Sequence, residues 1–170
     1  VISATLGLLV RDYLHLDNSL LGVATITGIL MAGRTVMSMV GAYIAGYGSD
    51  IAKNRWLVMS VCLGLCALSL LVLSSLTSLL IIIGVAFIAL ARGGVQSLTT
   101  SLTGDLVPVQ HRGRAVGILH TVGDFGSAVG PSAAFFLIPF WGLPKVYMLC
   151  AAIFSLSWLI NVAIFTVKQR

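Results

Sequence analysis

The stretch from Arg92 to Pro131 reads RGGVQSLTTSLTGDLVPVQHRGRAVGILHTVGDFGSAVGP. It begins with an arginine inside an apolar run, continues through a short charged loop, and ends with a run that carries His120, Asp124 and the sequence GSAVGP. The sequence on either side of it is long, apolar and almost uncharged. We therefore expect the working polar groups of this chain to lie in this stretch, and the remainder to form the wall around them.

The composition indicates a membrane protein. Of 170 residues, 58% are apolar, only ten are basic and five acidic, and the mean hydropathy is +1.06. A soluble domain of this size could hardly carry so much apolar sequence without aggregating. A strand barrel would show segments of about ten residues that alternate in polarity, and the sequence contains none.

The apolar runs predict five complete membrane helices and one partial one. A helix needs roughly 20 apolar residues to cross a hydrocarbon core of ~30 Å. Residues 20–48, 56–74, 79–102, 115–139 and 146–167 approach or exceed that length, whereas residues 1–10 would cover only about 15 Å. Because the chain starts without Met and without a basic flank, we interpret residues 1–10 as part of a truncated helix rather than a signal peptide. The predicted fold is all-α and polytopic, a single transmembrane helical bundle over residues 1–170.

The basic residues predict the orientation, because short cytoplasmic loops retain Lys and Arg. Alternate connections and the C-terminus contain six of them (Lys53, Arg55, Arg112, Arg114, Lys168 and Arg170), whereas the other connections contain two (Arg11 and Lys145). This pattern places the C-terminus in the cytoplasm.

Several other function classes lack support in the sequence. The net charge of +5 is not gathered on one wet face, so no nucleic-acid partner is predicted. Cys62, Cys66 and Cys150 lie in apolar runs without His or acidic neighbours, which favours reduced packing residues over a metal site. No glycine loop precedes a GK[ST] sequence, so ATP-driven pumping is unsupported and no cofactor is predicted.

Three ionisable side chains fall near mid-membrane depth: Arg34, Arg92 and Asp124. Charges at this depth face the protein interior and need partners. Arg34 is either a packing arginine satisfied by backbone carbonyls or a residue of substrate binding or gating. Asp124 either forms a fixed ion pair with Arg34 or Arg92 or takes up a proton. The predicted pathway also includes Gln96, one helical turn after Arg92, and His120, one turn before Asp124.

Two charged loops predict a gate at the cytoplasmic end. The first contains Gly46, Asp50, Lys53 and Arg55, and the second contains Asp105, Arg112 and Arg114. Their charges suit ion pairs that form and break as helices move, although the plain alternative is a solvated loop. Gly46 and Gly48 are expected to allow close backbone approach.

The fifth run is predicted to contain a packing groove of small residues at Gly126, Gly130 and Ala134, with a bend at Pro131. The last run, residues 146–167, has only Asn161 and a few hydroxyl side chains as polar groups. We expect that last helix to be peripheral.

These residues resemble the signatures of the major facilitator superfamily. Gly46, Asp50 and Arg55 resemble its cytoplasmic loop motif, in which Lys53 replaces the usual later glycine. Arg92 with Gln96 resembles its fourth-helix motif, although the glutamine is one place late and Ser97 follows it instead of glycine. Gly126, Gly130 and Pro131 are similar to the fifth-helix motif of proton-coupled exporters, with Ala134 and Phe135 where a glycine pair is usual. Asp105, Pro108, Arg112 and Gly113 are similar to the loop between the fourth and fifth helices.

The resemblance covers essentially the whole chain and implies one six-helix half of a transporter, here the C-terminal half, with its first helix truncated. It implies transport of a small molecule by alternating access, with proton-coupled efflux by an antiporter as the finer expectation. The implied partners are the lipid bilayer, a small-molecule substrate, protons and the missing other half. The implied location is the bacterial plasma (inner) membrane. The alternative is a receptor or assembly subunit on the same fold that does not transport.

An intramembrane enzyme is not predicted. Ser127 and His120 could suggest a nucleophile and its base, but seven residues on one helix separate them by roughly 10 Å. That distance exceeds hydrogen-bond reach.

Overall fold

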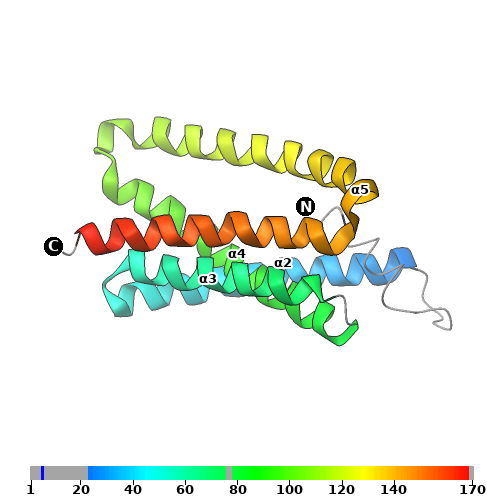
Figure 1. Cartoon of the computed structure of the whole chain (residues 1–170). Coiled ribbons are helices and arrows are strands. Elements are labelled where there is room, and N and C mark those ends of the chain that lie inside the picture. The colour runs from blue at the N-terminus through cyan, green and yellow to red at the C-terminus, as the bar shows by residue number, and fades with distance from the viewer. Residues whose placement is uncertain (1–4, 6–22, 76–77, 169–170) are drawn as a thin grey trace.

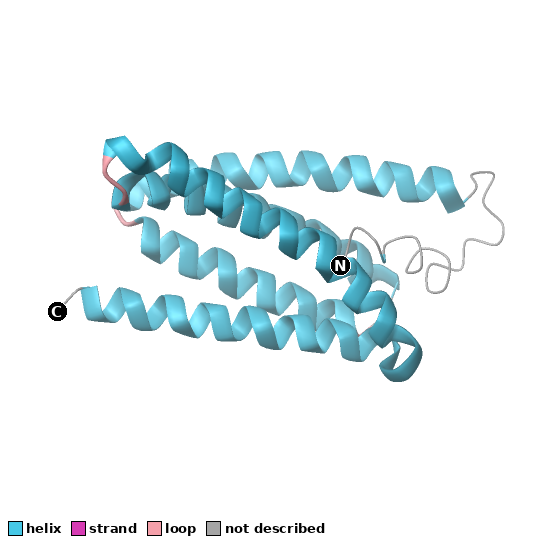
Figure 2. Ribbon diagram, turned by 90° about the horizontal axis from the view of Figure 1, so that it is seen from above, coloured by secondary structure: helices cyan, strands magenta, loops and turns pink. Residues whose placement is uncertain are grey.

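A computed structural model describes Thr5 and residues 23–75 and 78–168 (Figure 1). The predicted partial helix over residues 1–10 therefore lies outside the described residues except at Thr5, as do residues 20–22 of the next run. The described part of the chain consists of helices and short connections and contains no strand (Figure 2). The all-α membrane fold predicted from composition is confirmed.

The first two described helices are α2 (Val23–Ala52) and α3 (Arg55–Ser74). Only Lys53 and Asn54 separate them. Asn54 caps α3, because its side-chain oxygen accepts a hydrogen bond of 3.3 Å from the backbone N–H of Leu57. The α2–α3 connection is thus a tight turn, and α2 extends beyond residue 48, the predicted end of that run.

Helix α4 spans Ser78–Leu106 and also extends beyond its predicted end at residue 102. The Thr103 hydroxyl donates to the carbonyl of Thr99 at 2.8 Å, so its hydrogen bond is made within α4. The helix ends shortly before Pro108, which has no backbone N–H and disfavours a helical residue before it. A 3₁₀ turn, η1 (Val109–His111), then leads into α5.

Helix α5 spans Arg112–Lys168 and contains one break, at Gly142. Gly142 has φ 75° and ψ 162°, a conformation that glycine adopts readily. Pro144 falls in the first turn after the break, where a missing N–H does little harm. We call residues 112–141 the first arm and residues 143–168 the second arm, and Figure 1 shows the two arms running in opposite directions.

The break at Gly142 corrects the expected connection between the last two membrane runs. The predicted connection between residues 139 and 146 is helical except at this single glycine, so the chain reverses direction with almost no loop. The backbone of α5 keeps helical φ and ψ at Pro131, and the bend predicted there stays a prediction.

Four helices of the described chain are long and apolar enough to cross a membrane. The last of these contains both arms of α5, and each arm exceeds the roughly 20 residues that a crossing needs. Figure 1 shows the α2–α3 turn, η1 and the C-terminal end of α5 at one end of the bundle. This end carries Lys53, Arg55, Arg112 and Arg114, in agreement with the alternation of basic loops in the sequence.

Helices α2 and α4 form the most extensive contact of the bundle. Leu30 and Met31 pack into a core cluster with Ile81 and Val85, whereas Ala45 clusters with Leu98. Early residues of α2 therefore meet early residues of α4, and late residues meet late ones. The two helices run side by side in the same direction.

The second arm of α5 belongs to the core and is not peripheral as expected. Val146 and Tyr147 are 2% and 0% exposed, and the Ser60 hydroxyl on α3 donates to the side-chain oxygen of Asn161 at 2.6 Å. A hydrogen bond between helices is favourable in lipid, where the alternative is an unsatisfied polar group. Asn161 thus ties the second arm to α3.

Candidate functional site

Two glycines bring α2 and α4 into close contact at mid-depth. A Cβ atom at Gly41 would overlap the backbone carbonyl of Leu90, and one at Gly93 would overlap that of Ser38. Backbone atoms cannot rotate aside as a flexible side chain can. Small residues at helix crossings allow this kind of backbone approach in membranes, and here the crossing places the middle of α2 beside Arg92.

A cavity of about 310 Å³ lies between α4 and the first arm of α5. We call it the mid-depth cavity, because its residues come from the middle parts of both helices. One wall is contributed by α4 and the other by α5. Its lining residues are Arg92, Val95, Gln96, Thr99, Thr100, Leu119, His120, Gly123, Asp124 and Ser127.

Four of the five residues predicted for the pathway line this cavity: Arg92, Gln96, His120 and Asp124. Arg34 is not among the lining residues, but it lies close enough to Arg92 for the two positive charges to interact. Arg34 is therefore near Arg92, and Arg92 and Asp124 line the same cavity.

Asp124 has no ion pair with Arg34 or Arg92. The three side chains are all described, and within the described part of the chain no nitrogen–oxygen contact of 4.0 Å or less joins them. The first of the two alternatives for Asp124, a fixed ion pair with Arg34 or Arg92 inside the bundle, is thus not formed in this conformation. Arg92 and Asp124 instead face the same cavity from opposite walls.

The hydroxyl groups of the cavity all donate to the backbone of their own helices. Thr99 donates to the carbonyl of Val95 at 2.7 Å, and Thr100 donates to that of Gln96 at 3.1 Å. Ser127 donates to the carbonyl of Asp124 at 2.9 Å. A hydroxyl has one proton but two lone pairs, so these three groups can offer the cavity only acceptors.

Ser127, Leu119 and Gly123 were not predicted as site residues. Ser127 entered the sequence analysis only as a rejected nucleophile. Helical spacing could have found it, because positions 120, 123 or 124, and 127 fall on one face of a helix. His120 and Asp124 stand out on that face because they are ionisable, whereas Ser127 has only a hydroxyl group.

A second cavity, of about 340 Å³, lies at the end of the bundle that carries the basic loops. We call it the loop-end cavity. It brings together residues of the α2–α3 turn and of the end of α4. Its lining residues are Ser49, Asp50, Lys53, Asn54, Arg55, Trp56, Leu102, Asp105 and Leu106.

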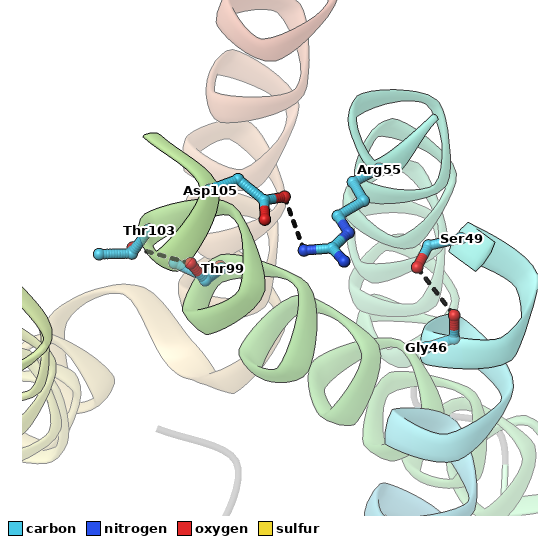
Figure 3. Close-up of polar contacts among 6 residues, drawn as sticks. All are labelled: Gly46, Ser49, Arg55, Thr99, Thr103 and Asp105. Carbon is cyan, nitrogen blue, oxygen red and sulfur yellow. Dashed lines mark hydrogen bonds and ion pairs between the residues drawn. The ribbon is translucent and has the colours of Figure 1, made fainter. Parts of the chain in front are cut away.

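An ion pair in this cavity joins the start of α3 to the end of α4. Arg55 Nη1 donates to Asp105 Oδ2 at 2.6 Å (Figure 3). Asp50 lines the same cavity but does not take Arg55 as its partner. This ion pair therefore connects the two predicted gate loops, whose paired residues are 50 positions apart in the sequence. It does not form within the α2–α3 loop.

The other predicted gate and packing residues lie apart from both cavities. Arg112 Nε donates to the carbonyl of Val107 at 3.2 Å, and Arg114 is exposed. A Cβ atom at Gly46 or Gly48 would meet nothing within 4 Å, and the carbonyl of Gly46 accepts a 2.8 Å hydrogen bond from the Ser49 hydroxyl. The expectation of close backbone approach at these two glycines is therefore wrong for the described residues. Close approach occurs at Gly41, and at Gly93, where the glycine pair Gly93–Gly94 already predicted close contact with a neighbouring helix.

The predicted groove on the first arm of α5 is also open at Gly126, where a Cβ atom would meet nothing within 4 Å. Ala134 is buried, at 3% exposed. Among the described residues, no group of three or more His, Cys, Asp or Glu side chains is placed to hold a metal ion. Cys62 and Cys66 are buried free thiols on α3.

Comparison with known proteins agrees with this architecture. The sequence model of the Major Facilitator Superfamily matches residues 1–170. A protein named staphyloferrin B transporter, from Staphylococcus aureus (strain NCTC 8325 / PS 47), is 30% identical over 105 residues, which is 62% of this chain and 25% of that protein. The match thus spans about a quarter of the length of this curated relative. No solved structure matches the chain.

The family match covers every residue, and the described chain is an all-α bundle with four helices long and apolar enough to cross a membrane. The family consists of transport proteins rather than enzymes, in agreement with the prediction that the chain is not an enzyme. The chain therefore belongs to the Major Facilitator Superfamily.

Proposed function

We propose that the full-length protein carries a small molecule across the membrane by alternating access, and that this chain supplies one half of the pathway. The observation that carries the proposal is the mid-depth cavity, where Arg92, Gln96, His120 and Asp124 converge from two helices. Ionisable groups at this depth mark substrate or ion pathways. Transporters bind their substrates near the midplane, between two structural halves.

The loop-end cavity supports a gate at the cytoplasmic side in this proposal. The Arg55–Asp105 ion pair joins two helices at the end where Lys53, Arg112 and Arg114 also lie. Breaking such a pair allows α3 and α4 to separate at this end while they remain packed at mid-depth. The positive-inside rule supports a cytoplasmic position for this end and for the C-terminus.

The missing partner in this proposal is the other six-helix half, with this chain as the C-terminal half in a bacterial inner membrane. The degenerate form of the cytoplasmic loop motif, with Lys53 in place of glycine, supports the assignment to the C-terminal half. An acid at mid-depth without an ion pair in the described chain supports proton coupling through Asp124, with His120 beside it as a relay. Efflux in exchange for protons is the finer form of the proposal.

Alternating access can be tested without knowledge of the substrate. Ser127 lines the mid-depth cavity, so Ser127→Cys in full-length protein without other accessible cysteines places one thiol in the pathway. A membrane-impermeant thiol reagent is applied to one side of oriented vesicles at a time. We expect labelling from both sides, because the cavity opens to each side in turn.

Val129→Cys is a matched control, since Val129 is on the same arm of α5 but does not line the cavity. We expect a labelling pattern at this position that differs from that of Ser127→Cys. Labelling of Ser127→Cys from a single side would overturn alternating access and would support the receptor or assembly subunit instead.

A further inference from the structure

We propose that the mid-depth cavity binds a zwitterionic ligand, with its carboxylate on Arg92 and its protonated amine beside Asp124. This proposal rests on the proposed function in one respect only: it takes the bound ligand to be the molecule that is transported. Binding itself follows from the charges and hydrogen-bonding groups of the two cavity walls.

The two walls carry opposite charges that do not neutralise each other. Arg92 is on the α4 wall and Asp124 is on the α5 wall, and no ion pair joins them within the described chain. Ionisable side chains at this depth pair with one another or line a pathway for a substrate or ion. A ligand with one charge of each sign would compensate both side chains at once.

The α4 wall suits a carboxylate. Arg34 lies near Arg92 and adds a second positive charge on this side of the cavity, which favours the negative end of a ligand here. The planar guanidinium group of Arg92 can bind a carboxylate through two parallel hydrogen bonds. Gln96 lines the cavity one turn further along α4, where its amide can add another donor.

The α5 wall and the hydroxyl groups suit an ammonium group. An ionised Asp124 only accepts hydrogen bonds, and an ammonium group has three donors and no acceptor. Thr99, Thr100 and Ser127 have used their protons on backbone carbonyls, so their remaining capacity is also for acceptance. The cavity therefore offers acceptors where a protonated amine needs them.

Ligands of a single charge fit less well. A dianion would satisfy Arg92 but would bring a second negative charge toward Asp124. A dication would satisfy Asp124 but would approach both Arg34 and Arg92.

Three probes with four-carbon chains separate these cases: 4-aminobutyrate is a zwitterion, succinate is a dianion and putrescine is a dication. The purified full-length protein is unfolded thermally with each probe, since a ligand that binds only the folded state raises the midpoint. We expect 4-aminobutyrate, or its shorter and longer relatives β-alanine and 6-aminohexanoate, to raise the midpoint more than succinate or putrescine does.

Variants of the two charged walls should change this preference in opposite directions. In Asp124→Asn we expect succinate to become the best of the three, and in Arg92→Gln we expect putrescine to become so. The apparent affinity for the zwitterion should fall at least about tenfold in both, since a hydrogen bond to a charged group is lost. Lys145→Gln, an exposed position that lines neither cavity, is the matched control and should keep the wild-type order.

If Asp124→Asn or Arg92→Gln fails to fold, variants that keep the charge still test the proposal. Arg92→Lys and Asp124→Glu retain the charges, and we expect both to keep the zwitterion as the preferred probe. A wild-type preference for succinate or putrescine would overturn the proposal, as would the absence of a midpoint shift with all three zwitterions. Thermal unfolding measures binding alone and thiol labelling at position 127 measures access alone, so failure of the ligand class is distinguishable from failure of the transport function.

Discussion

Lys53 has a backbone conformation that glycine adopts more readily than lysine. Its φ of 49° places it in the left-handed region, which costs an L-residue roughly 1–2 kcal/mol. Glycine avoids this strain but loses about 0.5–1 kcal/mol through its greater freedom in the unfolded chain. We therefore expect Lys53→Gly to raise the free energy of unfolding by about 0.5–1 kcal/mol, measured by denaturant unfolding in detergent.

Lys53→Ala is the control for this prediction, because alanine removes the positive charge but keeps the strain. We expect no gain in stability from it. An equal gain in both variants would assign the effect to the charge near Arg55 rather than to the backbone. The position matters because Lys53 replaces the glycine that is usual in the family's loop motif, and it lines the loop-end cavity.

At the scale of elements, the crossing of α2 and α4 depends on the absence of a side chain at Gly41. Alanine there would overlap the carbonyl of Leu90, and the only relief is separation of the two helices. Overpacking of this kind costs about 1–3 kcal/mol or more. We expect Gly41→Ala to lower the thermal unfolding midpoint clearly, and with it the yield of folded protein.

Gly33→Ala is the matched control on the same helix, because a Cβ atom there meets nothing within 4 Å. It should leave the midpoint unchanged or raise it, since alanine favours helix by about 1 kcal/mol over glycine. Equal midpoints for Gly41→Ala and Gly33→Ala would show that the two helices are not in backbone contact at Gly41.

The Arg55–Asp105 pair is also a contact between elements, and we expect it to affect transport rate more than stability. Both side chains are partly exposed, at 34% and 55%, and such pairs contribute about 0–1 kcal/mol. A change of 1 kcal/mol alters the balance between two conformations about fivefold. Arg55→Gln and Asp105→Asn should therefore change the flux of a transported ligand by up to about fivefold with little change in unfolding midpoint.

The exchanged double variant, Arg55→Asp with Asp105→Arg, restores an ion pair of the opposite polarity. We expect it to recover most of the flux in reconstituted vesicles. A double variant as impaired as the single ones would show that the side chains act separately, and not as a pair between α3 and α4.

At the scale of the whole molecule, Asp124 is expected to couple transport to protons. A carboxylate in the membrane is stable when charged in one conformation and when neutral in another, so binding of a proton shifts the balance between the two conformations. In full-length Asp124→Asn, we expect the flux of a transported ligand to fall, and the remaining flux to stop responding to an imposed pH gradient. The measurement is ligand flux in proteoliposomes with and without the gradient.

Ser132→Ala is a suitable control for the coupling experiment, because Ser132 is on the same arm of α5 outside the mid-depth cavity. It should keep the wild-type response to pH. If Asp124→Asn shows the same gradient-driven flux as the wild type, Asp124 does not couple transport to the proton gradient.

The sequence by itself determined the all-α membrane fold, the approximate position of the described crossings and the family. The length of an apolar run predicts a membrane helix because the backbone N–H and C=O groups in lipid must form their hydrogen bonds within their own helix. The charged signature residues were also visible in the sequence, and four of the five predicted pathway residues line one cavity. They share it because a helix places residues one turn apart on one face, and their role in a pathway stays a prediction.

Only the tertiary structure decided which parts of the helices meet. It pairs Arg55 with Asp105, places the close approach at Gly41 instead of Gly46 and Gly48, and reverses the chain at Gly142. It also brings the second arm of α5 into the core and separates Asp124 from Arg92 by a cavity. Local periodicity contains no information on the rotation and register of one helix against another, because those depend on side-chain packing between segments that are distant in sequence.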